Sequence, residues 1–189
     1  MPLFQQTGAY LRGHFRLTSG LHSSEYLQCA LVLQHPIHAE RLGRELGGKI
    51  RLAAPDSVIS SVVSPAVGGL IIGHETARAL GARALFAERG GDGKMTLRRG
   101  FCVSPGEGVV VVEDVVTTGG STREVIELLL AQGARVLAAG SIADRSGGRA
   151  DVGVTRVSLL TLDVASYAPE DCPLCREGAP LSKPGSRPV

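Results

Sequence analysis

Two adjacent acidic residues, Glu113 and Asp114, follow four consecutive valines, and small hydroxyl and glycine residues come directly after them. The valines predict a buried strand, and open parallel sheets bind their ligands at the carboxyl ends of their strands. A helical pattern begins at Ser121, so the run Thr117–Thr122 lies at a helix start. Unpaired backbone N–H groups and the positive end of the helix dipole favour an anion there. A phosphate group fits this position.

The two carboxylates need a different partner from the hydroxyl and glycine run. The hydroxyls of Thr117 to Thr122 can donate to phosphate oxygens, whereas Glu113 and Asp114 would repel the same anion. Sugar hydroxyls or a divalent metal suit carboxylates, and a sugar phosphate that carries a chelated metal offers both. The alternative is that the acids merely end a strand and that Ser121 or Thr122 merely caps a helix. All of these features in one uninterrupted run favour a ligand site.

The segment Val109–Thr122 resembles the phosphoribosyl diphosphate motif of type I phosphoribosyltransferases, in which two acids after a strand precede a Thr/Gly loop. The resemblance implies that Glu113 and Asp114 hold the ribose hydroxyls. It implies Mg²⁺ as the cofactor, without direct protein ligands, and a homodimer with shared active sites. The implied contacts to the 5′-phosphate come from Thr117, Thr118, Gly119, Gly120 and Ser121.

Other stretches resemble the orotate phosphoribosyltransferases of that family, and together they span nearly the whole chain except its tail. Gly13–Gly20 and Ser23–Gln28 resemble the N-terminal substrate loop and strand. Arg145 follows a predicted strand and matches the arginine that contacts orotate; its planar fork suits a carboxylate. The alternative for Arg145 is a surface arginine at a strand end. The family often has Lys at the position of Thr18, so the positive charge must come from elsewhere here. The implied orotate contacts are Arg145, Thr117, Thr18 and Tyr26.

Two glycine-containing loops complete the resemblance. Ser64–Gly69 resembles the diphosphate-binding loop, which implies contacts from Ala66 and Val67, although the family often has Lys where Gly68 stands. The alternative is an ordinary strand-to-helix turn. Glu88–Arg99 contains three glycines within six residues and resembles the catalytic flap, which reaches across a dimer to the neighbouring site. A solvated charged loop is the alternative. The implied catalytic residues are Lys94, Arg89 and Asp114, with Arg98 or Arg99 assisting Lys94.

The elements around these motifs alternate between strands and helices. Apolar runs with β-branched residues predict strands, and longer periodic segments predict helices, an order typical of a parallel sheet with helices on its faces. We therefore expect an α/β protein with the type I phosphoribosyltransferase fold: a central, mostly parallel sheet flanked by helices, with a small N-terminal hood. The predicted strands are 57–63, 83–87, 109–112, 136–142 and 157–162, with an irregular β element over 13–33; the predicted helices are 3–11, 37–50, 69–80 and 121–131.

Length and composition favour one domain with a small ligand. The 189 residues suit a single core, in which 1–34 form the hood and opening helix, 35–165 the phosphoribosyltransferase core and 166–189 an irregular Pro-rich tail. A net charge of +2 and an aromatic content of 4% argue against nucleic acid or an anionic membrane as partner. Without a long apolar run or a secretory pattern over Met1–Leu11, we expect a cytoplasmic protein.

Two further patterns carry less weight. Gly43–Ile50 nearly spells a Walker A loop, but Ile50 replaces the hydroxyl that should contact magnesium, and the segment lies inside a helical pattern. Cys172 and Cys175 have redox or zinc spacing, yet one pair supplies only two of four ligands. A structural role is expected for this pair, with a zinc ion shared across a dimer as the alternative. Cys29 and Cys102 are expected to be small core residues.

The resemblance implies transfer of the phosphoribosyl group from 5-phosphoribosyl 1-diphosphate to orotate, which gives orotidine 5′-phosphate and diphosphate in pyrimidine biosynthesis. Two alternatives stay open. The first is a phosphoribosyltransferase that uses a purine base. The second is a non-enzymatic regulator that binds phosphoribosyl diphosphate and nucleic acid, against which the small net charge argues.

Overall fold

A six-stranded sheet forms the centre of the structure, a computed structural model that describes residues 1–17 and 19–184. All neighbouring strands pair in parallel except β5, which is antiparallel to β4 at one edge. The strand order is β5 (Met95–Leu97), β4 (Arg83–Arg89), β3 (Ser61–Pro65), β6 (Gly108–Val116), β7 (Arg135–Asp144) and β8 (Arg156–Thr161).

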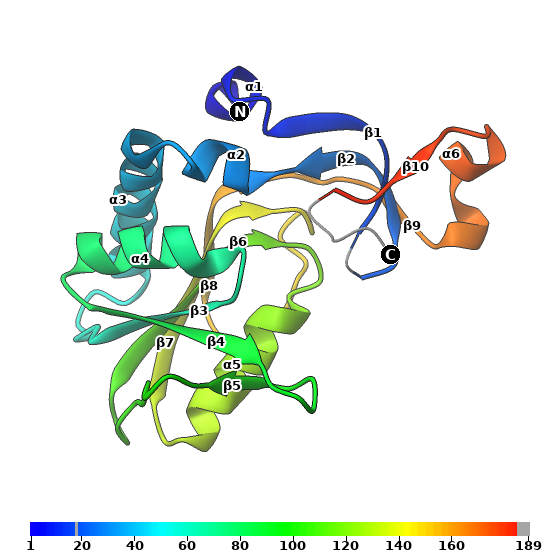
Figure 1. The fold of residues 1–189 in the computed structure, drawn as a ribbon. Coiled ribbons are helices and arrows are strands. Elements are labelled where there is room, and N and C mark those ends of the chain that lie inside the picture. Colours follow the sequence, from blue (N-terminus) through cyan, green and yellow to red (C-terminus); the bar gives the residue numbers. More distant parts are fainter. Residues whose placement is uncertain (18, 185–189) are drawn as a thin grey trace.

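Helices cover both faces of this sheet, with α3 (Pro36–Ala53) and α4 (Gly69–Leu80) on one face and α5 (Gly120–Ala131) on the other (Figure 1). Successive side chains of a strand point to opposite faces. Val110 and Val112 accordingly lie in the apolar core beneath α3 and α4, whereas Val109 and Val111 lie in the core beneath α5. All four valines are fully buried. The predicted α/β class and the mostly parallel sheet flanked by helices are confirmed.

The sequence that nearly spells a Walker A loop lies within α3, as its helical pattern predicts. Its glycines allow two helices to pack closely rather than forming a phosphate loop. A Cβ atom added at Gly43 would lie 2.6 Å from the backbone carbonyl carbon of Glu75 in α4, a distance that the packing could not accommodate unchanged. Gly47 faces Ala79 and Leu80 of the same helix.

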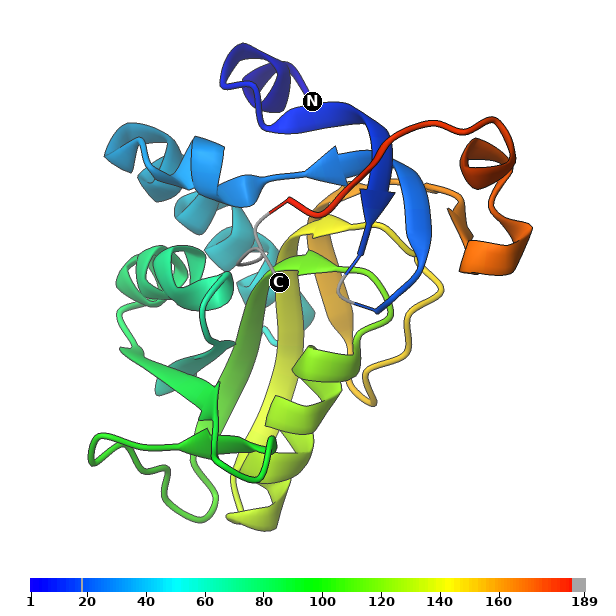
Figure 2. The same cartoon turned by 45° about the vertical axis from the view of Figure 1, so that its right-hand side comes forward.

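A second, four-stranded sheet forms the hood, and Figure 2 shows it beside the carboxyl ends of the central strands. β1 (Tyr10–Arg16) and β2 (His22–Leu27) form an antiparallel hairpin. Segments from the other end of the chain pair with both sides of it: β10 (Leu181–Ser182) with β1, and β9 (Ser166–Tyr167) with β2. The predicted irregular tail therefore adds short strands to the hood, with a 3-10 turn (Pro169–Asp171) and α6 (Pro173–Arg176) between them.

Several predicted boundaries differ from the structure, three of them at the N-terminal part of the chain. The opening helix α1 covers only Pro2–Gln6, because Gly8 turns the chain with a φ of +66° before β1 begins. Cys29–Leu33 forms the short helix α2 rather than a strand; a short apolar run cannot be assigned to helix or strand by periodicity alone. The predicted strand over 57–63 begins only at Ser61. No helix in the described ranges combines the length and the apolar character needed to cross a membrane.

Candidate active site

A cavity of about 480 Å³ opens at the carboxyl ends of β3, β6 and β7, beneath the hood. Ligands of open α/β sheets bind at this edge. The cavity brings together most of the residues that the sequence predicted to bind substrate. Its lining from the core is Pro65, Ala66, Gly68, Arg89, Glu113 to Thr122, Glu124 and Arg145, and its lining from the hood is Leu17, Ser19, Tyr26, Leu27 and Gln28.

Glu113 and Asp114 lie on the cavity wall at the end of β6, which continues beyond the predicted strand to Val116. The Asp114 backbone N–H donates to Glu113 Oε1 at 3.3 Å, and the Val115 N–H donates to Asp114 Oδ1 at 2.8 Å. Burial raises the pKa of both carboxyl groups, and the charge of Asp114 raises that of Glu113 further. Hydroxyl donors or a cation in the cavity would therefore stabilise the charged form of each acid.

The loop after β6 leads into α5 with its backbone donors open to the cavity. Gly119 precedes the helix with a φ of +82°, a conformation that other residues rarely adopt. A Cβ atom there would also lie 2.8 Å from Val152 Cγ1. Gly119, the residue at the cap position of α5, has no side chain to cap the helix, and no acidic residue occurs in the first turn. The first N–H groups of a helix have no partner inside it, so this terminus suits an anion.

The loop after β3 contributes to the same cavity only in part. Ala66 and Gly68 line the cavity, whereas Val67 is 79% exposed and is not among the lining residues. The Ala66–Val67 peptide bond is cis. A Cβ atom added at Gly68 would lie 2.7 Å from Asp114 Oδ1. A larger residue at position 68 would therefore have to displace the Asp114 carboxylate.

Arg145 is buried where the core meets the hood, with 4% of its surface exposed. Its Nη2 donates to Ser23 Oγ and to the Glu25 carbonyl oxygen, both at 2.8 Å. Its Nε–H is buried without a hydrogen-bond partner among the described residues. Burial lowers the pKa of this guanidinium, partly offset by Tyr26 and Glu25. An acceptor on a ligand in this cavity would supply the missing hydrogen-bond partner of Nε–H. The burial of Arg145 does not fit the alternative of a surface arginine.

Asp144 fixes the backbone on either side of Arg145. Its Oδ1 accepts from the Ser146 N–H at 2.8 Å and from the Ser146 hydroxyl at 2.6 Å, and its Oδ2 accepts from the Gly148 N–H. Arg156 Nη1 lies 2.6 Å from Asp144 Oδ2. Burial raises the pKa of Asp144, but these hydrogen bonds and the Arg156 charge outweigh it, so the net shift is downward. The carboxylate therefore stays ionised and holds the loop in place.

Of the other three residues predicted to contact orotate, two line the cavity. Thr117 and Tyr26 line the cavity, and the Tyr26 hydroxyl donates to the Pro184 carbonyl oxygen at 3.4 Å. Burial and the nearby Asp114 raise the Tyr26 pKa. Thr18 lies outside the described residues.

The predicted flap forms an antiparallel hairpin of β4 and β5. Arg89 lines the cavity, and its Nη1 forms an ion pair with Glu124 Oε2 at 2.8 Å. Lys94 lies at the hairpin tip, where its N–H donates to Asp92 Oδ1, and it is not among the residues that line this cavity. Of the predicted flap cations, Arg89 alone lines the cavity of its own chain, and Arg98 and Arg99 form ion pairs with Glu88 instead.

Sequence reasoning missed Glu124 and Gln28, which also line the cavity. Glu124 lies one helical turn after Gly120, so its side chain returns to the side of the helix start. That spacing is visible in the sequence and could have indicated Glu124 as the partner of a nearby cation. Gln28 lies between β2 and α2 of the hood and carries no comparable signal in the sequence.

Comparisons with known proteins agree with this geometry. Residues 34–172 match the family model described as a phosphoribosyl transferase domain. The orotate phosphoribosyltransferase of Pelotomaculum thermopropionicum is 59% identical over 189 residues, which cover 100% of this chain and 97% of that protein. The orotate phosphoribosyltransferase of Thermotoga maritima is 54% identical, with 98% and 96% covered. The crystal structure of the Aeropyrum pernix orotate phosphoribosyltransferase superposes with a TM-score of 0.68 at 33% identity, covering 85% of this chain and 92% of that one. The chain belongs to the phosphoribosyltransferase family, among its orotate phosphoribosyltransferases.

Proposed function

We propose that this chain transfers the phosphoribosyl group of 5-phosphoribosyl 1-diphosphate to orotate and releases orotidine 5′-phosphate and diphosphate, as a step of pyrimidine biosynthesis. The observation that carries the proposal is the buried Arg145 guanidinium, which shares one cavity with the acid pair and with the uncapped start of α5. These three features complement the three parts of the reacting pair: an acidic base, a ribose and a phosphate. Relatives named for the same activity support the same substrate.

The substrate lies in the cavity with each part against a group of opposite character. The 5′-phosphate accepts from the loop Thr117–Ser121 and from the N–H groups at the start of α5. The ribose hydroxyls donate to Glu113 and Asp114, which removes part of the energetic cost of burying two acids side by side. The orotate carboxylate and carbonyl edges accept from Arg145, close to Thr117 and Tyr26.

The oxygen-rich wall formed by Glu113 and Asp114 also fits a Mg²⁺ ion near the ribose. We assign the direct ligands of this ion to substrate oxygens and water, with both carboxylates favouring the cation from nearby. When bound, Mg²⁺ neutralises charge on the diphosphate. The remaining catalytic contributions come from the protein.

The reaction needs no nucleophile from the protein. Displacement at the anomeric carbon develops positive charge on the sugar and negative charge on the leaving diphosphate, so catalysis depends on positioning and on stabilising the leaving group. The backbone of Ala66 and Val67 and the cations Arg89 and Lys94 supply that stabilisation. Closure of the β4–β5 hairpin excludes water, which would otherwise compete for the sugar.

The position of Lys94 favours a homodimer with shared active sites. Lys94 lies at the tip of the β4–β5 hairpin and outside its own chain's cavity lining, so we assign it to the cavity of a second copy of this chain. We also propose that the enzyme acts in the cytoplasm, where a reducing environment keeps its four cysteines free of disulfide bonds.

A base-selection assay tests the proposed function. The purified protein is mixed with 5-phosphoribosyl 1-diphosphate, Mg²⁺ and one of orotate, uracil, adenine or hypoxanthine, and diphosphate release and base absorbance are followed. We expect turnover with orotate alone, because only this base carries a carboxylate for Arg145. Turnover with a purine base instead would establish the first alternative. Binding of 5-phosphoribosyl 1-diphosphate without turnover of any base would favour a regulator.

A further inference from the structure

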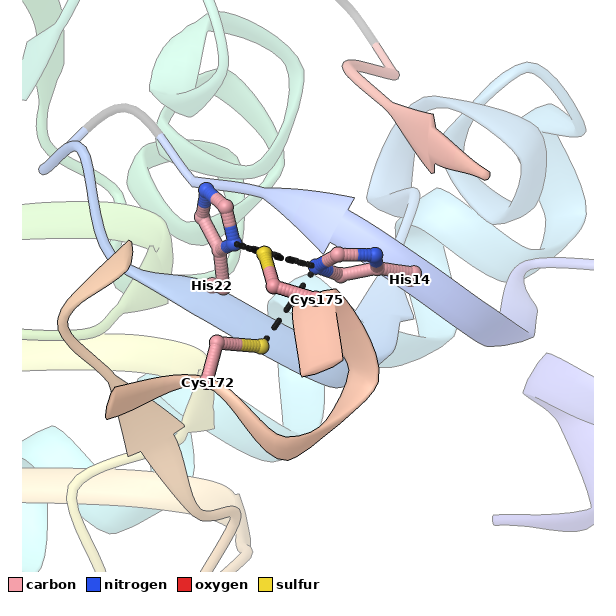
Figure 3. A group of neighbouring side chains, drawn as sticks. All are labelled: His14, His22, Cys172 and Cys175. Carbon is pink, nitrogen blue, oxygen red and sulfur yellow. Dashed lines mark hydrogen bonds between the residues drawn. The ribbon is translucent and has the colours of Figure 1, made fainter. Parts of the chain in front are cut away.

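Four potential metal ligands from the two ends of the chain meet within the hood: His14 of β1, His22 of β2, and Cys172 and Cys175 at α6 (Figure 3). One ligand atom of each residue lies within 4.8 Å of the other three. None of the four residues lines the cavity of the active site. Both histidines and Cys172 are buried, and Cys175 closes the cluster toward solvent.

Four of the six separations between these atoms lie close to the edges of a tetrahedron around zinc, and the other two are at most 4.8 Å. Zinc lies about 2.05 Å from nitrogen and about 2.3 Å from sulfur, which gives edges of about 3.3 Å between nitrogens and about 3.6 Å between nitrogen and sulfur. His14 Nε2 lies 3.0 Å from His22 Nδ1. Cys172 Sγ and Cys175 Sγ lie 3.5 and 3.6 Å from His14 Nε2, and Cys175 Sγ lies 3.2 Å from His22 Nδ1.

A hydrogen-bond network accounts poorly for the same arrangement. His14 Nδ1 lies 2.9 Å from the Ala179 carbonyl oxygen, which can only accept, so Nδ1 carries the proton and Nε2 of the neutral ring has a bare lone pair. That single lone pair faces His22 Nδ1 and both thiols. It can accept from only one of them, whereas one cation would satisfy all four atoms. A backbone carbonyl on the second nitrogen is also the usual support of a metal-bound histidine.

The segment that carries the cysteines has little apolar contact to hold it. Between residues 165 and 184, Cys172 is the one buried residue. α6 buries no apolar side chain, and β9 and β10 are two residues long each. The hydrophobic effect therefore contributes little to the docking of this segment on the hood, so another interaction must fix it.

We propose that His14, His22, Cys172 and Cys175 bind one structural Zn²⁺ ion within a single chain, which fastens the C-terminal segment to the hood. Two thiolates and two imidazoles form a ligand set typical of zinc, and four protein ligands leave no open position for catalysis. Binding releases the two thiol protons, so affinity rises with pH. The cysteine pair thus obtains its missing ligands from the β1–β2 hairpin of its own chain rather than from a dimer partner.

Metal analysis of the reduced, purified protein tests this proposal. We expect one zinc per chain, and the same stoichiometry when the protein is freed of metal by a chelator and then given zinc. Cobalt in place of zinc should give a visible spectrum with thiolate charge-transfer bands and the intensity of a tetrahedral site. A protein that holds neither zinc nor cobalt after this treatment, or that carries a Cys172–Cys175 disulfide when prepared under reducing conditions, would overturn the proposal.

Variants distinguish zinc bound at this site from zinc bound adventitiously elsewhere on the protein. Cys172→Ser and His22→Asn should lose the zinc, whereas Cys102→Ser, which removes an exposed cysteine outside the cluster, should keep it. Chelation should lower the unfolding temperature of the wild-type protein by several degrees and leave that of Cys172→Ser unchanged. Equal zinc content in Cys172→Ser and wild type would contradict the proposal. If a variant fails to fold, the chelation and cobalt experiments on the wild type still decide. None of these readouts depends on the proposed activity.

Discussion

Glu113, which is buried, and Asp114, which is half-buried, place adjacent carboxyl groups at one end of β6, and the Asp114 N–H donates to Glu113 Oε1 at 3.3 Å. Burial raises the pKa of both groups, and each would be more easily accommodated without its charge. A core designed for stability alone would have neutral residues here. The pair therefore destabilises the ligand-free protein, a cost that the hydroxyl donors of the substrate offset in the proposed mechanism.

Glu113→Gln should change how stability depends on pH. Because the folded-state pKa of Glu113 is raised, the native protein binds more protons than the unfolded chain from about pH 4.3 up to that pKa, and stability falls as pH rises through this window. Glutamine removes this contribution. Denaturant titrations without ligand should show the variant more stable than wild type above the window, with no such advantage below about pH 4.

The same Glu113→Gln variant should lose activity with 5-phosphoribosyl 1-diphosphate, because an amide binds ribose hydroxyls less well than a carboxylate. Glu127→Gln, on the exposed side of α5, serves as the control and should keep the pH dependence and the activity of wild type. A loss of folding in Glu113→Gln would instead indicate a structural role for the acid.

Arg145→Lys should weaken orotate binding while 5-phosphoribosyl 1-diphosphate binding is retained. Nη2 already donates to Ser23 Oγ and to the Glu25 carbonyl oxygen. A guanidinium has further N–H donors for a ligand, whereas the single ammonium group of lysine does not present them in the same planar geometry. A hydrogen bond to a charged group contributes about 1.5–3 kcal/mol, which corresponds to a KM for orotate raised roughly 10- to 100-fold. Steady-state kinetics with each substrate varied in turn measures this. Arg149→Lys, at an exposed ion pair with Asp163, is the matched control. A normal KM for orotate in Arg145→Lys would remove Arg145 from base recognition.

The parts of the site that the sequence predicted are those encoded locally. The valines of β6, the acids, the Thr/Gly loop and α5 follow one another within a single stretch, so strand and helix periodicity place them without knowledge of the rest of the fold. The same holds for Arg145, which directly follows β7.

The parts that the sequence did not predict depend on distant segments. The contact between Cys172 Sγ and His14 Nε2 spans 158 residues, and no local pattern connects a tail with a hairpin at the other end of the chain. The pairing of Arg89 with Glu124 likewise follows from the way β4 and α5 approach in space. Short strands such as β9 and β10 form only because β1 and β2 offer free edges, so their own residues give little signal.

Mixing two inactive variants should restore activity if the active sites are shared. Lys94→Ala should lower turnover about 10²-fold if Lys94 contacts the leaving diphosphate, and Asp114→Asn should lower it by impairing the ribose site. After the two variants exchange subunits, a mixed dimer contains one cavity with an intact Asp114 and an intact Lys94 from its partner. With half of the dimers mixed and one intact site in each, activity should recover to about a quarter of wild type.

Activity measured before and after subunit exchange checks this prediction. Lys49→Ala changes a lysine of α3 whose Nζ donates to the Ser158 carbonyl oxygen, and it should behave as wild type alone and in mixtures. A mixture that stays as inactive as its components would show that Lys94 acts on its own chain. Full activity of Lys94→Ala alone would remove it from the mechanism.

Gly119→Ala should damage the phosphate loop and destabilise the fold together. The left-handed backbone at φ +82° costs a residue with a Cβ atom about 1–2 kcal/mol, and that atom would also press on Val152 Cγ1 at 2.8 Å. Relief of this contact would move the loop away from the proposed position of the phosphate, so the KM for 5-phosphoribosyl 1-diphosphate should rise while thermal stability falls. Gly120→Ala is the matched control for stability: its φ is ordinary, and its added Cβ would meet only Thr118 Oγ1 at 3.7 Å. Equal unfolding temperatures for the two variants would show that the conformation of Gly119 imposes no such constraint.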